Sequence, residues 1–147
     1  MNLDTYNLGS KPGFLSFEFT SEGPKGKIRK IIQFNKIIGQ NDTYNLGFGD
    51  SDEEGNMDDL VVSNNKDSQK ILVTVATSVI IFTDNYPNAL VLAQGSTPSR
   101  IRYYTMGISK HLQAIAGKFE IWGALSENEW ELFRKNRPYK ALLAKRK

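Results

Sequence analysis

The chain has 147 residues, of which 39% are hydrophobic and 24% are charged, and its net charge is +3. This length and composition predict one globular domain over residues 1–147 with a core of its own. The absence of cysteine excludes disulfides, thiolate metal sites and cysteine nucleophiles, and it favours a reducing compartment. The polar N-terminus and the lack of an apolar run of roughly 20 residues predict a cytoplasmic protein without a membrane span.

Alternating patterns in the first part of the chain predict two β-hairpins. In FLSFEFT the large hydrophobic residues share one face, and period two resumes after the turn EGPKGK. The first hairpin is therefore expected over 14–22 and 27–38, with Lys30 as an irregularity on its apolar face. A second hairpin is expected from strands at 43–49 and 59–63, joined by the acidic turn DSDEEGNMD.

The segment 65–85 predicts a long helix followed by a buried strand. Hydrophobic residues recur in this segment at helical spacing, and its start offers three candidate N-caps, Asn65, Asp67 and Ser68. The sequence NYP ends the helix, because the residue before a proline disfavours the helical conformation. The apolar run 89–93 then predicts a strand that is buried on both faces.

The last third of the chain predicts a bent helix and two further strands. GSTPSRIRYY begins a helix at Pro98, and Gly107 is expected to interrupt it, so that Ser109 can cap a second piece running to about Ala116. The segments 119–125 and 139–145 predict strands, with a helical turn at SENEWELF between them.

This order of elements, ββββα and then βαββ, predicts an α+β fold. One long helix and one bent helix pack on a mostly antiparallel sheet in this arrangement. The opening ββββα resembles, in topology alone, half of the Whirly and coactivator-type single-strand DNA-binding folds. No motif residue of those folds is matched.

The motifs of common enzymes and metal sites are missing from the sequence. DSDEEGNMDDLV has the spacing of a calcium loop, but Val61 stands where the bidentate glutamate belongs. His111 is the only histidine, and neither a phosphate loop nor a nucleophile elbow is present. The sequence therefore assigns no catalytic residue, no metal site and no cofactor.

The turn GSTPSRIRYY is the strongest candidate for a binding site. Ser96 or Thr97 can cap the helix, and Pro98 suits its first position. Arg100 then lies near the positive end of the helix dipole, where a cation is unfavourable. It requires a negative partner, either a carboxylate from elsewhere in the fold or a bound anion such as phosphate.

Helical angles separate the two arginines of this turn. Arg102 lies about 200° around the helix from Arg100, so the pair cannot clamp one group. Arg100 lies beside Tyr104 at the edge of the core face and is expected to be partly buried, whereas Arg102 faces solvent. With the cations of the first hairpin, the candidate site for an anion or nucleic acid comprises Ser96, Thr97, Arg100, Arg102, Tyr104, Lys25, Lys27 and Arg29.

Three functions fit these features. The first is a non-enzymatic module that binds nucleic acid or a partner protein through the hairpin 25–36, the turn 95–102 and the basic C-terminal tail. The second is a metal-independent nuclease of the small bacterial toxin type. In it Arg100 stabilises the developing charge, and Tyr104 or His111 transfers protons. The third is a structural or regulatory homo-oligomer in which Arg100 forms an internal salt bridge.

Three segments together carry a resemblance to a protein family: FEFTSEGPKGKIRKIIQF, then YNLGFGDSDEEGNMDD with NNKDSQKILVTVATSV, and finally GSTPSRIRYYTMGI. They resemble a family of small uncharacterised proteins with a domain of unknown function, found mainly in Bacteroidetes. The resemblance extends from about Tyr6 to the C-terminal KRK. It implies a bacterial cytoplasmic protein and supplies no catalytic residues.

Overall fold

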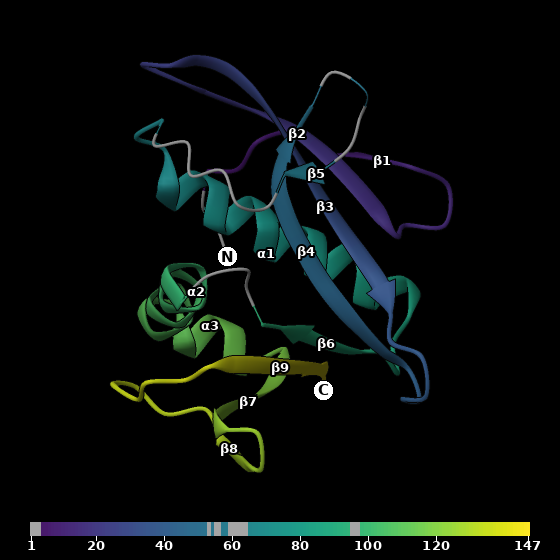
Figure 1. Ribbon diagram of the computed structural model, residues 1–147, viewed down its shortest axis with the longest axis vertical. Coiled ribbons are helices and arrows are strands. Elements are labelled where there is room, and N and C mark those ends of the chain that lie inside the picture. The colour runs from purple at the N-terminus through teal and green to yellow at the C-terminus, as the bar shows by residue number, and fades with distance from the viewer. Residues whose placement is uncertain (1–3, 53, 55–56, 59–64, 95–97) are drawn as a thin grey trace.

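The structure is a computed structural model that describes residues 4–52, 54, 57–58, 65–94 and 98–147. Within these residues, nine strands form one continuous sheet in the order β1-β2-β3-β4-β6-β9-β7-β8, with β5 paired to β4 (Figure 1). β4 and β6 run parallel, and the other neighbouring strands run antiparallel. The strands are β1 (Gly9–Ser10), β2 (Ser16–Gly23), β3 (Gly26–Lys36), β4 (Thr43–Ser51), β5 (Met57–Asp58), β6 (Leu90–Ala93), β7 (Phe119–Ser126), β8 (Glu129–Leu132) and β9 (Ala141–Arg146).

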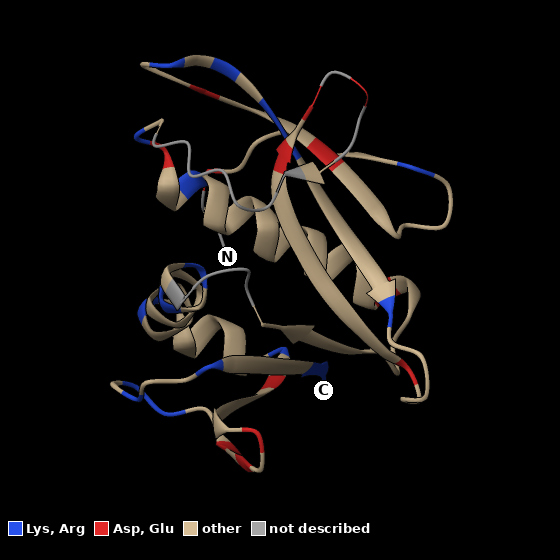
Figure 2. Ribbon diagram, viewed as in Figure 1, with Lys and Arg blue, Asp and Glu red and all other residues tan. Residues whose placement is uncertain are grey.

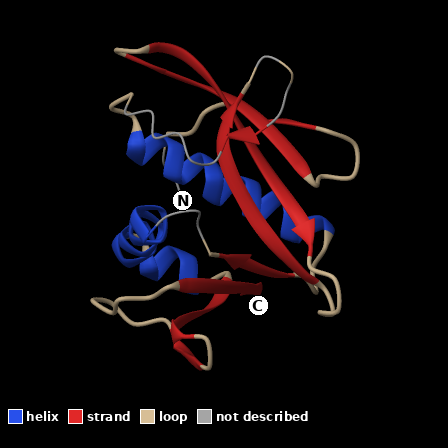
Figure 3. Cartoon of the chain, viewed as in Figure 1, coloured by secondary structure: helices blue, strands red, loops and turns tan. Residues whose placement is uncertain are grey.

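Three helices pack on this sheet, and the predicted α+β class is confirmed (Figure 3). They are α1 (Ser68–Asn85), α2 (Pro98–Lys110) and α3 (Leu112–Ala116). α1 covers β2–β4, where the ring of Phe82 stacks on that of Phe34 at a centroid distance of 4.2 Å. α2 packs against the other half of the sheet, where Ile101 and Tyr104 join a cluster with Leu142. No helix in the described part of the chain is long and apolar enough to cross a membrane.

The predicted first hairpin is confirmed as β2 and β3. Its turn is tight, because Gly23 and Gly26 pair across it and Gly26 adopts a positive φ of 89°. β4 matches the strand predicted at 43–49 and pairs with β3. The strand predicted at 59–63 lies outside the described residues. β5, just before it in the chain, pairs with the end of β4.

The long helix predicted over 65–85 is confirmed as α1, with a different start. Asp67 occupies the N-cap position, but its side chain makes no capping hydrogen bond. Its Oδ2 instead accepts hydrogen bonds from the hydroxyls of Tyr6 and Ser21. The helix ends at Asn85, the first residue of NYP, as predicted.

The predicted interruption at Gly107 is wrong, because α2 continues through it to Lys110. The bend follows at His111, and α3 begins at Leu112. Gly107 lies where α2 crosses α1: a Cβ added there would lie 1.9 Å from Cδ2 of Leu72. This glycine therefore permits a close approach of two helices rather than a break in one of them.

The close approach predicts that Gly107→Ala destabilises the protein by about 1–3 kcal/mol, since the new methyl group overpacks the contact. In a Leu72→Ala background the obstructing atoms are gone. There the same change should be neutral or stabilise by up to about 1 kcal/mol, because alanine is the better helix former. Urea unfolding of the four proteins measures both effects. An equal loss of stability from Gly107→Ala with and without Leu72→Ala would contradict the close contact between Gly107 and Leu72.

The helical turn predicted at SENEWELF is also wrong. Residues Glu129–Leu132 form β8, which pairs with β7 so that Leu132 lies opposite Trp122. The physical reason is a set of contacts from the following segment. The Glu131 carboxylate accepts hydrogen bonds from Nε of Arg137 at 2.8 Å and from the Tyr139 hydroxyl at 2.7 Å. These tertiary contacts override the local helical preference.

The strand predicted at 139–145 is confirmed with a shift, as β9 over Ala141–Arg146. Tyr139 is not part of the strand. Its ring lies over β7, where a Cβ added at Gly123 would come within 2.4 Å of it. The tyrosine therefore packs as a core side chain ahead of β9.

Hydrogen bonds from Arg137 and Tyr139 hold the pKa of the Glu131 carboxyl below its ordinary value. A carboxyl with a lowered pKa adds stability above its unfolded-state pKa, and this contribution is lost as the pH falls through the folded-state pKa. We predict that Glu131→Gln lowers Tm at neutral pH and that its difference from the unmodified protein narrows between about pH 5 and pH 3. Glu129→Gln, at an exposed position of the same strand, is the control. The same pH-dependent difference in both variants would contradict the assignment.

Candidate functional site

The structure divides the predicted site residues into two groups and leaves two of them undescribed. Ser96 and Thr97 lie outside the described residues. Arg100, Arg102 and Tyr104 lie in the first turns of α2, whereas the cations Lys25, Lys27 and Arg29 lie at the turn of the β2–β3 hairpin. The hairpin turn and α2 lie on the same side of the view in Figure 2, with the start of α1 between them.

Arg100 points inward, toward β4. Its guanidinium donates a hydrogen bond to the backbone carbonyl of Phe48, and its Cζ lies 5.1 Å from the centroid of the Phe48 ring. A carbonyl oxygen and an aromatic face both carry partial negative charge. These contacts supply part of the negative partner that the sequence predicts for the Arg100 cation. They also hold the start of α2 against the sheet.

Phe48 is also in contact with a second cation, Lys30. This lysine, the irregularity in the first hairpin, is only 4% exposed and lies opposite Asp50 across the β3–β4 pair. It forms an ion pair with the Asp50 carboxylate, and its Nζ lies 5.9 Å from the centroid of the Phe48 ring. A buried ammonium is tolerated when a carboxylate compensates it. The sequence signal for the Lys30–Asp50 pair was a lysine at a position where the alternating pattern of the strand places core residues.

A polar network fixes the β2–β3 hairpin to the start of α1. The side-chain amide of Asn65, which is buried, donates to Oγ of Ser21 at 3.1 Å and to the carbonyl of Gly26 at 3.0 Å. Its Oδ1 accepts a hydrogen bond from the backbone N–H of Lys25 at 2.7 Å. The backbone that carries the hairpin cations is therefore held in a defined position. Sequence reasoning treated Asn65 only as a cap and missed this role.

The two tyrosines of α2 serve packing. Tyr103 donates a hydrogen bond from its hydroxyl to the carbonyl of Ser68, which joins α2 to the first turn of α1. Tyr104 is buried in the core. Burial raises the pKa of Tyr103, and it raises the pKa of Tyr104 despite the opposing effect of Arg100.

His111 lies at the other end of α2 from Arg100, about 16 Å away along the helix axis. Its Nε2 is 2.8 Å from Nε2 of Gln69 on α1. The structure thus brings Tyr104 close to Arg100, and it does not bring His111 there. In the described part of the chain, no group of three or more His, Asp and Glu side chains is placed to hold a metal ion.

The outward face of α2 is basic. Ser99, Arg102, Met106 and Lys110 are exposed and recur at a spacing that places them on one side of the helix. Met106 is 66% exposed, which is unusual for a large hydrophobic residue. No Asp or Glu occurs in the sequence between Asp84 and Glu120, so no acidic residue of α2 or α3 offsets these cations.

The contacts of Arg100 and Arg102 predict opposite results for the same substitution. Arg100→Gln should lower the free energy of unfolding by about 1–3 kcal/mol, because it removes a charged donor from a half-buried carbonyl. Arg102→Gln should change it by less than about 0.5 kcal/mol, because Arg102 is exposed. Urea unfolding of both variants makes the comparison. Equal losses would contradict the inward placement of Arg100.

Comparison with known proteins identifies the family of the chain. A family model described as "Family of unknown function (DUF6934)" matches residues 2–147, and the chain belongs to this family. No curated protein matches the chain, and no solved structure matches it. The predicted resemblance to an uncharacterised family is confirmed, while the distribution in Bacteroidetes stays a prediction. The family contributes no functional residues.

Proposed function

We propose that this member of the DUF6934 family is a non-enzymatic module that binds nucleic acid through the outward face of α2 and the turn of the β2–β3 hairpin. The observation that carries the proposal is the exposed basic stripe of α2 within a stretch without acidic residues. Exposed cations that no neighbouring carboxylate offsets attract the phosphate backbone and release its counterions on binding.

The geometry of α2 suits contacts with more than one phosphate. Arg102 and Lys110 lie about 12 Å apart along the helix axis, so they reach different groups of an extended ligand. Met106 lies between them with an exposed, adaptable side chain, which offers apolar surface to a base or sugar. This arrangement favours a polymeric anion over a single small one.

The hairpin turn adds positive charge on the same side of the view in Figure 2. Arg29 pairs with Glu18 at 3.0 Å, and Nζ of Lys27 lies 4.0 Å from Glu22, so carboxylates offset both of these cations in part. Lys25 has no acidic partner among the described residues. We therefore expect Lys25 to contribute more than its two neighbours, and the hairpin to contribute less than α2.

Other basic segments differ in their position relative to α2. Lys and Arg residues between β8 and β9 lie on the same side of the view as α2 (Figure 2). The C-terminus lies at the end of β9 away from α2 (Figure 1), so we do not include the basic tail in the proposed surface. Arg146 in that region pairs with Asp84 at 2.7 Å.

The nuclease and oligomer alternatives stay predictions. The nuclease hypothesis requires a proton-transfer group beside Arg100. Tyr104 is buried with a raised pKa, and His111 is at the far end of the helix. These placements favour binding without catalysis. The oligomer hypothesis requires no residue or surface beyond those described above.

Fluorescence polarisation with labelled single- and double-stranded oligonucleotides tests the proposal. We expect binding that weakens as salt rises, with a log–log slope of about −0.7 per phosphate contact for single strands and −0.9 for duplexes. The Arg102→Gln/Lys110→Gln variant should bind more weakly, with a slope smaller in magnitude by about 1 to 2.

The matched control is Lys145→Gln/Lys147→Gln, which removes the same charge from exposed positions at the C-terminal end of β9. It should leave the affinity nearly unchanged. The absence of salt-sensitive binding to any oligonucleotide would refute the proposal. Equal losses in the two double variants would show that net charge, rather than the face of α2, determines binding.

A further inference from the structure

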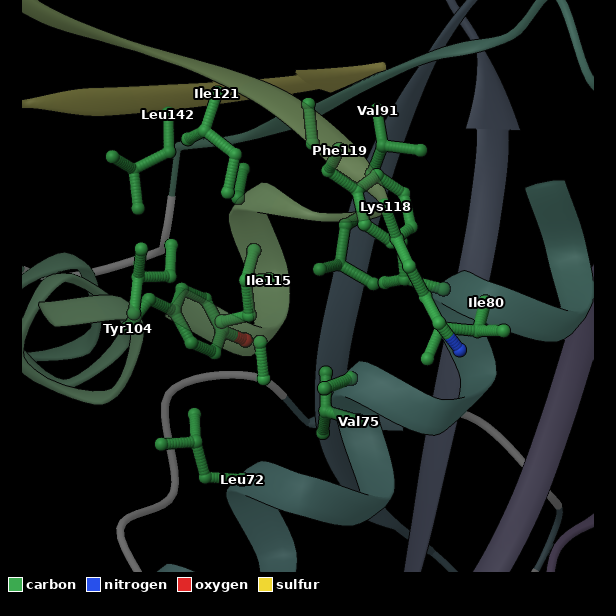
Figure 4. A pocket seen from close by; sticks show the side chains of 17 residues that line it. Leu72, Val75, Ile80, Val91, Tyr104, Ile115, Lys118, Phe119, Ile121 and Leu142 are labelled. Carbon is green, nitrogen blue, oxygen red and sulfur yellow. The ribbon is translucent and has the colours of Figure 1, made fainter. Parts of the chain in front are cut away.

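A cavity of about 140 Å³ lies beneath the three helices, against the middle strands of the sheet (Figure 4). Its walls are almost wholly apolar and come from seven elements of the fold. They include Leu72 and Val75 of α1, Ile115 of α3, Val91 of β6, Ile121 of β7 and Leu142 of β9.

The size of the cavity sets it apart from ordinary packing gaps. Protein interiors hold few voids larger than a water molecule, and larger ones destabilise the fold. An apolar cavity of about 150 Å³ stays dry and accepts a benzene-sized guest. The cavity here therefore suits an apolar body of about six carbon atoms.

One cation lies at the rim of the cavity. The stem of Lys118 lines the wall, and its amine extends beyond the aliphatic lining to a point beside Ile80 (Figure 4). Lys118 is exposed, and no carboxylate pairs with its amine in the part of the chain that the structure describes. Arg146 stacks over Phe119 nearby, but it is already paired with Asp84.

The lining as described includes no Asp or Glu, and the other titratable side chain in it is Tyr104. Burial raises the pKa of the Tyr104 hydroxyl by more than the charge of Arg100 and its hydrogen bond lower it, so this group stays neutral. The interior thus offers apolar surface, and the rim offers one positive charge. A ligand that matches both has an apolar body and one anionic end.

We propose that this cavity binds a small monocarboxylic acid, with its apolar body among the aliphatic side chains and its carboxylate paired with the amine of Lys118. The inference is independent of nucleic-acid binding, because Lys118 is not on the outward stripe of α2. An uncharged apolar guest is the competing occupant, and the experiment separates the two.

Isothermal titration calorimetry with hexanoate and 1-hexanol tests the proposal, since the two probes share a body and differ in charge. Hexanoate should bind saturably and about two- to fivefold more tightly than 1-hexanol, the factor that one rim ion pair supplies. Lys118→Gln should remove this preference and leave the affinity for 1-hexanol unchanged.

Lys145→Gln is the matched control, because the same charge is removed from the other face of β9, next to the lining residue Ala144. It should retain the preference for hexanoate. Ala76→Leu should fill the cavity and abolish binding of both probes. Ala144→Val serves the same purpose if the first variant does not fold. Absence of hexanoate binding, equal affinity for the two probes, or an equal effect of Lys118→Gln and Lys145→Gln would each overturn the proposal.

Discussion

The placement of α2 depends on the contact between Arg100 and Phe48. The guanidinium donates to a carbonyl of β4 and lies over the aromatic ring, so the start of the helix is held against the sheet. Two turns further along the helix, Gly107 lets α2 approach α1 closely. With rotation fixed at these two points, Tyr104 turns toward the cavity, and Arg102 turns toward solvent. The basic face and the apolar cavity are thus two consequences of one helix orientation.

Much of the fold could be predicted from local patterns. Alternation gave the β2–β3 hairpin, and the proline after Tyr86 marked the end of α1, because these signals depend on neighbouring residues alone. The wrong predictions concern segments whose secondary structure depends on contacts with residues distant in the sequence. The strand β8 depends on hydrogen bonds from Tyr139 to Glu131, and the continuity of α2 through Gly107 depends on Leu72 of another helix.

The part of the candidate site that depends on charge and on helical angle could be predicted from the sequence. The spacing of Arg100 and Arg102 placed one near the core and the other in solvent, because a helix converts sequence separation into direction. The partner of Arg100 could not be predicted, because it is a backbone carbonyl of β4 and every residue type has such a carbonyl. The cavity could not be predicted at all. It exists where three helices meet the middle strands, and no segment encodes it alone.

We propose the outward face of α2 as the surface that meets nucleic acid. Methyl-¹³C methionine labelling tests it directly, because Met106 lies on that face and Met57 lies on β5, within 3.6 Å of the Cβ position of Gly47. During titration with an oligonucleotide at low salt, the Met106 methyl signal should shift progressively and the Met57 signal should stay in place. Binding that leaves the Met106 signal unmoved would rule out the outward face of α2 as the contact surface.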